Sequence, residues 1–251
     1  MRARFGFRLS KETLALIKGA AKMELFHRLS GSRLLEELIH LLSEEEPRKA
    51  VARLQELDLL RFIHPGLKRR SGLDRMLKPV EDALDWYKLL YLDRKMDGWL
   101  VYFMALMDVI SGDAVRETLK RLMVPERNAE KIRIARFRSE DLLRRLGRPS
   151  LRPSEIYRIL DGLPDEAVLL LLAKAKSESA KRRLSAYLTT YRQMKPLLTG
   201  DDLQAIGIRP GPIYKNILDR LLEARLNGEA TTAADERVLA IRMATGQDGV
   251  Q

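Results

Sequence analysis

The chain has 251 residues, of which 45% are hydrophobic, so it is long enough to bury a core and is not a disordered tail. It contains no cysteine, which excludes disulfides, zinc–thiolate sites and cysteine nucleophiles. Its formal net charge of +11 favours a polyanionic partner, with nucleic acid ahead of an anionic membrane surface. The longest apolar run lies within Trp99–Ile110 and is too short to span a bilayer, and the N-terminus lacks a signal-peptide pattern, so we expect a cytoplasmic protein without membrane contact.

Helix signals dominate the first part of the chain. Ser10 can cap a helix whose apolar residues recur at helical spacing. A loop at residues 29–32 precedes a second amphipathic helix, and Pro47 stands where the first turn of a third helix would begin. Leucine, alanine, glutamate, lysine and arginine dominate this region, and these residues favour helix over strand.

The middle of the chain contains the most apolar segment and a run of arginines. Residues 98–110 are hydrophobic nearly all round, which predicts a buried helix. Ser111 or Asp113 can cap the next helix, and Pro125 opens another helix that is rich in arginine. The segment Gly147–Pro153, with the sequence GRPSLRP, is the candidate hinge.

The last part of the chain also predicts helices. These cover residues 154–160, a segment opened by Pro164, a basic segment at 179–192, and further helices after Pro196. Residues 245–251 show no apolar periodicity and are expected to fray. No alternation of period two is long enough to predict a sheet, so the predicted fold class is all-α.

Sequence patterns for catalysis are scarce. The three histidines form no HExxH pattern, and the glycine-rich phosphate loops and the GxSxG motif are not found. Asp201 and Asp202 are adjacent, but Thr199 three positions before Asp202 resembles a helix capping box, an interpretation that we favour over a metal-binding acidic pair. We therefore assign no catalytic and no metal-binding residue.

The C-terminal segment 199–218, TGDDLQAIGIRPGPIYKNIL, is the first candidate for binding phosphate. It contains two helix starts, whose free N–H groups and positive dipole ends suit an anion. Gly211 lets the backbone approach closely, and Arg209 and Lys215 add positive charge. A tight helical connection that is held for packing alone explains the segment equally well.

The basic segment at residues 179–192 is the second candidate. Its apolar residues can face a core, which leaves Lys181, Arg182 and Arg183 on the outside. Side chains placed in this way can follow a sugar–phosphate backbone without reading sequence. A solvated basic face is the alternative interpretation, and the pattern alone does not exclude it.

Several segments resemble, in the same order, parts of one enzyme family. These are RFGFRLSKETLALI near the N-terminus, SGSRLLEELIHLL with Arg33, Glu37 and Leu38 in the places of an ERxxxEL motif, LLRFIHP, RPSEIYRIL, AKAKSESAKRRLSAYL and TGDDLQAIGIRPGPIYKNIL. The order is similar to the C-terminal two thirds of bacterial class II tRNA nucleotidyltransferases, which include CCA-adding enzymes, A-adding enzymes and poly(A) polymerases. The resemblance extends from about Arg4 to Leu239 and is greatest to the long-bodied A-adding branch.

This resemblance implies a fold and a ligand. The fold would be an elongated all-α arc with a neck at residues 1–46, a helical body at 47–195 and a tail at 196–251. In the family, the body and tail hold the tRNA acceptor–TΨC arm by its shape and backbone. We therefore expect tRNA-like RNA as the partner, and Arg33 and Glu37 as a structural pair in the neck. The expected RNA-binding residues are Lys181, Arg182, Arg183, Arg209, Gly211 and Lys215, together with Arg133 and Arg136.

The sequence also departs from the family. The catalytic head and the nucleotide-selecting EDxxR motif have no counterpart in this chain, and Ser32 stands where the neck motif usually has glutamate. We therefore expect Mg²⁺ and ATP to bind only when a head is present, and we expect no nucleotide addition by this chain alone. Incorporation of ATP into tRNA by the purified chain would contradict that expectation.

Two interpretations of such a chain are open within the family. It is either a truncated product or one subunit of a split enzyme whose head is a separate polypeptide, and the sequence does not tell whether the parent adds A, CCA or poly(A). Outside the family, the alternative is a helical-repeat scaffold that binds proteins. The salt dependence of binding distinguishes these functions, because phosphate-driven binding of RNA weakens steeply as salt rises, whereas binding through an apolar interface does not.

Overall fold

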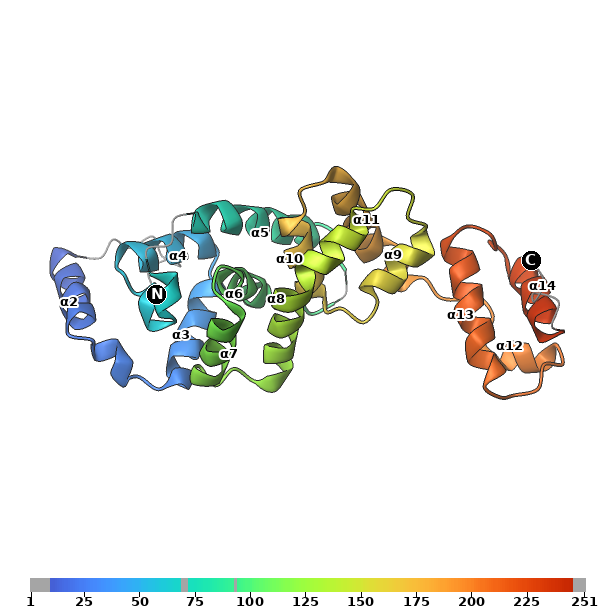
Figure 1. Cartoon of the computed structure of the whole chain (residues 1–251), viewed down its shortest axis with the longest axis horizontal. Coiled ribbons are helices and arrows are strands. Elements are labelled where there is room, and N and C mark those ends of the chain that lie inside the picture. Colours follow the sequence, from blue (N-terminus) through green and yellow to red (C-terminus); the bar gives the residue numbers. More distant parts are fainter. Residues whose placement is uncertain (1–9, 69–71, 93, 246–251) are drawn as a thin grey trace. The chain divides into compact units, whose positions relative to one another are not determined.

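The computed structural model describes residues 10–68, 72–92 and 94–245 (Figure 1). Over these ranges the chain forms α-helices and short 3-10 helices, with no strand, which confirms the all-α prediction. The chain divides into two compact units. Unit 1 comprises Met1–Leu143 and Leu163–Glu178, and unit 2 comprises Arg144–Gly162 and Ser179–Gln251. The boundaries of neck, body and tail inferred from the sequence stay a prediction.

Capped helices form the N-terminal part of unit 1, as the sequence predicts. Ser10 accepts a hydrogen bond from an N–H of the first turn of α2 (Lys11–Lys22), and Ser30 does the same for α3 (Gly31–Leu42). Pro47 is the first residue of α4 (Pro47–Glu56), where its missing N–H costs nothing. The connections contain the 3-10 helices Leu25–Arg28, Leu60–Phe62 and Pro65–Leu67.

The core of unit 1 is built around three helices that pack on one another, α5 (Leu73–Lys88), α6 (Gly98–Asp108) and α10 (Asp165–Lys174). Every side chain from Leu100 to Met107 of α6 is buried, which confirms the prediction of a helix that is apolar nearly all round. Burial of such a helix removes a large apolar area from water and thereby stabilises the unit.

Ion pairs hold α10 in this core at both of its ends. The buried Glu166 carboxylate accepts a hydrogen bond from Lys131 Nζ at 2.8 Å. At the other end, Lys174 Nζ donates to Asp108 at 2.7 Å and to Ser139 Oγ at 2.9 Å. Because an unpaired charge would be costly at these depths, each pair specifies the position of α10. Unit 1 therefore takes one of its central helices from a later stretch of sequence.

A glycine allows two helix ends of unit 1 to meet. A Cβ atom on Gly31, the first residue of α3, would lie 1.7 Å from the carbonyl oxygen of Arg121, the last residue of α7 (Gly112–Arg121). The Arg121 side chain in turn donates to the carbonyl of Ile63 at 3.1 Å. Ser111 caps α7, which selects between the two caps considered from the sequence, and α8 (Glu126–Leu146) follows Pro125.

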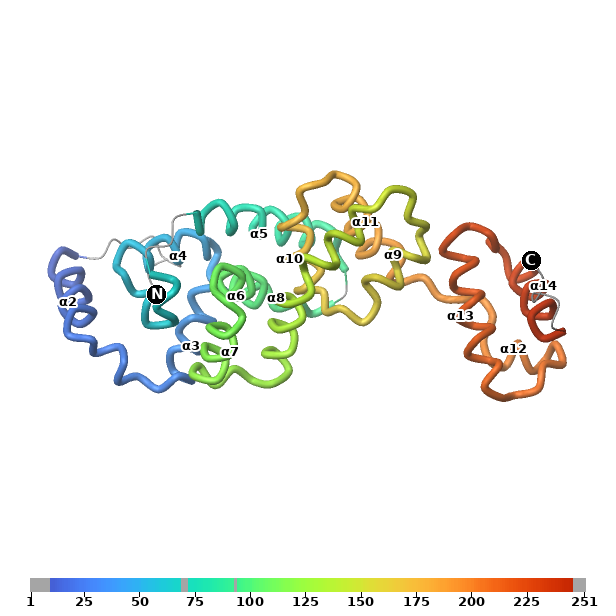
Figure 2. Tube along the Cα trace, viewed as in Figure 1, coloured from blue at the N-terminus to red at the C-terminus, as the bar shows by residue number. Residues whose placement is uncertain are grey.

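Helices also make up the described part of unit 2. The α9 helix (Pro153–Leu160) packs on α13 (Ile213–Leu226). Asn227 Oδ1 accepts from the Ser154 N–H at 3.1 Å, and Arg158 pairs with Glu223 at 3.0 Å. Figure 2 follows the trace through α12, α13 and α14 at the C-terminal end. The helices of this unit are α9 (Pro153–Leu160), α11 (Glu178–Thr189), α12 (Gly200–Ala205), α13 (Ile213–Leu226) and α14 (Ala233–Ala244), and Tyr191–Gln193 is a 3-10 helix.

The basic helix α11 is shorter than the sequence predicts. The pattern predicts a helix to residue 192, but α11 ends at Thr189 and a separate 3-10 turn follows. Thr189 Oγ1 donates to the carbonyl of Ser185 at 2.9 Å, and two adjacent β-branched threonines disfavour continuation of the helix.

Replacement of Gly31 by alanine should destabilise the protein, because the new methyl group would overlap the Arg121 carbonyl and force α3 and α7 apart. We expect a loss of roughly 3 kcal/mol in the free energy of unfolding, measured by urea denaturation. The control is Gly19→Ala in α2, where a Cβ meets nothing within 4 Å. That change should be neutral or stabilising by about 0.5–1 kcal/mol, and equal effects of the two changes would contradict the proposed contact.

Candidate functional site

Capping boxes begin two helices of the C-terminal segment. The Thr199 N–H and hydroxyl both donate to Asp202 Oδ2 at 2.7 Å, which opens α12 and confirms the capping interpretation of Asp202. Thr232 and Asp235 repeat the arrangement at the start of α14. Among the described residues, no group of three or more His, Cys, Asp or Glu side chains is placed to hold a metal ion.

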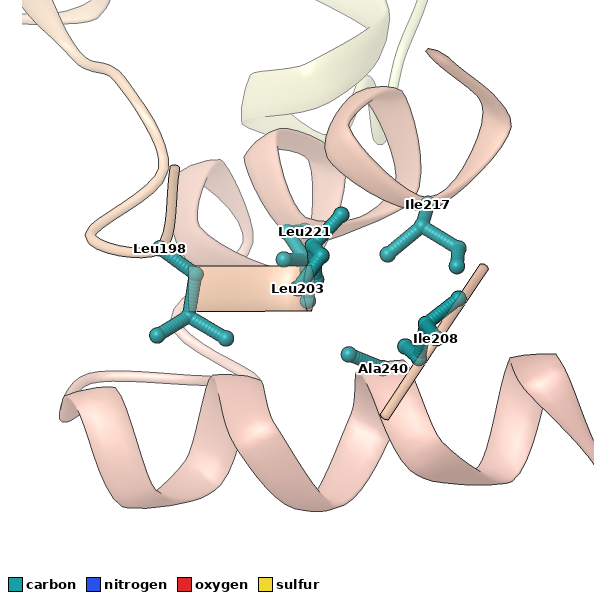
Figure 3. Close-up of a cluster of buried hydrophobic side chains, with 6 residues drawn as sticks. All are labelled: Leu198, Leu203, Ile208, Ile217, Leu221 and Ala240. Atoms are coloured by element: carbon teal, nitrogen blue, oxygen red, sulfur yellow. The ribbon is translucent and has the colours of Figure 1, made fainter. Parts of the chain in front are cut away.

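A small apolar cluster holds the connection between α12 and α13 in place. Six buried side chains from five segments meet in it (Figure 3). Gly207 adopts φ +88°, a backbone conformation that glycine accepts at little cost, and Tyr214 Oη donates to the Ile208 carbonyl at 2.8 Å. The connection therefore has one defined path. The cluster consists of Leu198, Leu203, Ile208, Ile217, Leu221 and Ala240.

A buried carboxylate completes this segment. The side chain of Glu236 in α14 is 0% exposed, and its Oε2 accepts from the backbone N–H groups of Leu197 and Leu198 at 2.8 and 2.9 Å. Arg225 of α13 lies 3.6 Å from the other oxygen. One side chain of the last helix thereby links α13 and the segment that leads into α12.

The predicted residues of the α12–α13 connection are all exposed. Arg209, Gly211 and Lys215 lie at its surface, and no ion pair involves Arg209 or Lys215 within the described chain. The N-terminus of α13 has no side-chain cap, so N–H groups of its first turn are available to an anion. Arg209 also borders a hollow of about 400 Å³ whose lining includes Ile213 and Ile241.

The three predicted residues of α11 have different surroundings. Arg182 is exposed, and no ion pair involves it within the described chain. Lys181 is half-buried and does have an interaction partner. Arg183 Nη1 donates to the carbonyls of Leu146 and Arg148, both at 2.6 Å, so this guanidinium binds the end of α8. The structure thus gives Arg183 a role in holding the backbone that its sequence pattern did not reveal.

The two predicted arginines of α8 lie in unit 1, not in unit 2. Hydrogen bonds to the Glu130 and Glu126 carboxylates raise the pKa of Arg133, and the bond to Glu130 has the larger effect. Arg136 donates to the carbonyl of Ile110 at 3.0 Å. Both guanidinium groups therefore already have acceptors within the protein.

The predicted neck residues Arg33 and Glu37 both lie on the exposed side of α3. Within the described chain, no ion pair joins them. The backbone N–H of Arg33 donates to Ser30 Oγ at 3.3 Å, which places this residue in the first turn of the helix.

Comparison with known proteins identifies the relatives of this chain. Residues 6–70 match a family model described as the probable RNA and SrmB-binding site of polymerase A. Over 246 residues, 96% of the chain, the sequence is 42% identical to an A-adding tRNA nucleotidyltransferase from Geobacter sulfurreducens. The chain is related to the A-adding tRNA nucleotidyltransferases. A second enzyme of this description, from Aquifex aeolicus, is 24% identical over 193 residues, and the resemblance inferred from the sequence is thereby confirmed.

The relatives are longer than this chain. It covers 28% of the Geobacter protein and 23% of the Aquifex protein, so it spans about a quarter of their length. A Thermotoga maritima CCA-adding enzyme complexed with tRNA has the same fold, with a TM-score of 0.77 and 21% sequence identity over 96% of this chain and 58% of that structure. Within the described residues, no helix combines the length and apolar character that a membrane crossing needs.

The two capping boxes should make the C-terminal segment sensitive to acid. Hydrogen bonds from the Thr199 hydroxyl and N–H lower the pKa of Asp202, and those from the Thr231 and Thr232 N–H groups lower the pKa of Asp235. A lowered pKa stabilises the fold above the unfolded value of about 4, and this contribution is lost as pH falls through the folded value. Urea denaturation should show a loss of stability below about pH 4 that Asp202→Asn with Asp235→Asn reduces. If the double variant loses as much stability below about pH 4 as the unaltered chain does, the two carboxylates are not the cause of the acid sensitivity.

Replacement of Glu236 by alanine should destabilise unit 2, because it leaves the N–H groups of Leu197 and Leu198 without their acceptor and the Arg225 guanidinium without its ion-pair partner. We expect a loss of roughly 3 kcal/mol by urea denaturation, and a smaller loss for Glu236→Gln, which keeps one acceptor oxygen. The matched control is Arg237→Ala, an exposed neighbour on the same helix. A loss for the control equal to that for Glu236→Ala would refute the assignment.

Proposed function

We propose that this chain is the RNA-binding part of a tRNA nucleotidyltransferase of the A-adding type, and that it holds the acceptor–TΨC arm of tRNA. The observation that carries the proposal is the 42% identity to the Geobacter enzyme along 96% of the chain. The match of residues 6–70 to a model of an RNA-binding site supports it independently. The net charge of +11 suits an anionic ligand of this size.

The α12–α13 connection is the proposed contact with the RNA backbone in the C-terminal segment. Arg209 and Lys215 are exposed and have no carboxylate partner in the described chain, and the first turn of α13 offers uncapped N–H groups. The apolar cluster of Figure 3 and the Glu236 link keep these groups in one arrangement. Donors held in advance lose little entropy when they bind a phosphate.

The proposed enzyme would carry out its catalytic steps in a different part from this RNA-binding part. Addition of a nucleotide requires carboxylates that hold metal ions, and among the described residues no group of three or more His, Cys, Asp or Glu side chains is placed to hold one. We therefore propose that Mg²⁺ and ATP bind to a head that is either joined to this region in a longer protein or supplied as a separate polypeptide. In that arrangement the role of this region is to position the 3′ end of tRNA.

Binding of a tRNA transcript to the 251-residue chain should be tight at low salt and should weaken steeply as salt rises, with double-stranded DNA a weaker competitor. Arg209→Ala with Lys215→Ala should lower the affinity roughly tenfold and flatten the dependence of log affinity on log salt by about 1.8, because two phosphate contacts are lost. The measurement is a fluorescence titration at several salt concentrations.

The matched control for this titration is Arg127→Ala with Lys120→Ala, which removes the same charge from exposed residues of unit 1 that lie outside the matched range 6–70. If the unaltered chain fails to bind tRNA at low salt, or binds it with no dependence on salt, the proposed function is wrong. If both double variants lose affinity equally, the ligand responds to net charge only, and the assignment to the α12–α13 connection fails.

A further inference from the structure

A guanidinium group of α11 binds the end of α8. Arg183 Nη1 donates to the carbonyls of Leu146 and Arg148, at 2.6 Å in each case. These carbonyls belong to the last turn of α8 and to the segment that connects it with α9. Ser150 in the same connection adopts φ +53°, which is uncommon outside glycine. The connection therefore follows a defined path beside the N-terminal half of α11, all within unit 2.

The hydrogen bonds of Arg183 also change the electrostatics of this helix end. The C-terminus of a helix carries a partial negative charge on its free carbonyl groups, and this charge repels a phosphate. A guanidinium that donates to the Leu146 and Arg148 carbonyls satisfies them and offsets their charge. The end of α8 would ordinarily repel an anion, and the hydrogen bonds of Arg183 allow an anion to bind there.

Three further arginines belong to, or adjoin in sequence, the residues joined by these hydrogen bonds, and we call them the α8–α11 patch: Arg145 on the last turn of α8, Arg148 in the connection, and Arg182 on α11. Arg148 and Arg182 are exposed and Arg145 is partly exposed. Within the described chain, no carboxylate lies within ion-pair distance of any of the three. Like charges gathered in this way repel one another unless an anion binds between them.

We propose that the α8–α11 patch is a second phosphate-binding site for the RNA backbone, and that Arg183 is the residue that positions it. The proposal rests on the proposed function and adds a contact surface that lies on different elements from the α12–α13 connection. Guanidinium groups bind phosphate oxygens in pairs, which favours a sugar–phosphate backbone as the ligand. The patch itself contains no aromatic ring on which a base could stack, so it should read the backbone and not the sequence.

This proposal changes the expected role of Arg183. If Arg183 were a direct ligand, its replacement would remove one phosphate contact, and this loss of affinity would not depend on Arg148. As a positioning residue it holds the Arg148 backbone, so its replacement should also remove the contribution of Arg148. A double-mutant cycle between the two residues separates these roles, because only coupled residues give non-additive changes in affinity.

The experiment is a titration of the full chain with a tRNA transcript at several salt concentrations. Arg148→Ala and Arg182→Ala should each lower the affinity roughly three- to tenfold at 0.1 M salt and reduce the salt slope by about 0.9. The control is Arg75→Ala, an exposed arginine of α5 in unit 1 with no ion-pair partner in the described chain. It removes the same charge from another unit and should change the slope little.

The cycle compares Arg148→Ala in the unaltered chain and in Arg183→Ala, with circular dichroism used to select folded protein. We expect Arg148→Ala to have little further effect once Arg183 is replaced. Arg183→Lys, which keeps the charge, tests the role if Arg183→Ala does not fold, and it should also weaken the effect of Arg148→Ala.

Additive effects of Arg148 and Arg183 would overturn the positioning role. If Arg148→Ala and Arg182→Ala act no more strongly than Arg75→Ala while the unaltered chain binds tRNA in a salt-dependent manner, the patch is not an RNA contact and the proposed function stands. If the unaltered chain does not bind tRNA at all, both proposals fall.

Discussion

The packing of α10 against α5 and α6 is the interaction on which unit 1 depends. Its apolar side chains complete a core that earlier helices begin, and its two ends are tied by the Glu166–Lys131 and Lys174–Asp108 pairs. Because α10 follows α9 in sequence, the chain leaves unit 1, enters unit 2 and returns before it continues. The connection after α8 lies in unit 2, where the hydrogen bond from Arg183 to the Arg148 carbonyl places Arg148 beside α11.

Two groups of arginines contribute to the positive charge of this protein. Some arginines donate to backbone carbonyls, as Arg121, Arg136 and Arg183 do, and these hold helices and connections together. Others, among them Arg182 and Arg209, are exposed without a carboxylate partner in the described chain. The first group satisfies backbone acceptors, and the second is available to a polyanion. The sequence gives the total number of arginines but does not show to which of the two groups each arginine belongs.

Helix caps and apolar periodicity were the features that could be read from the sequence, because both act over a few residues. Ser10, Ser30 and Thr199 cap the helices that the pattern predicts, and α6 is buried as its composition requires. The contacts that decide roles at the candidate site are long-range. Nothing in the sequence around Glu236 distinguishes a buried carboxylate from the exposed capping acid beside it, and nothing around Arg183 indicates two carbonyl acceptors thirty-odd residues earlier.

The Glu236 link has a consequence for protein synthesis. The carboxylate that holds Leu197 and Leu198 belongs to α14, and so it leaves the ribosome after α9, α11, α12 and α13. A nascent or prematurely ended chain without α14 has no acceptor for those N–H groups, and its α12–α13 connection lacks the Ala240 side of its core. Only a chain that already includes α14 can therefore present Arg209 and Lys215 in a fixed arrangement, so this surface forms later in synthesis than α12 and α13 themselves.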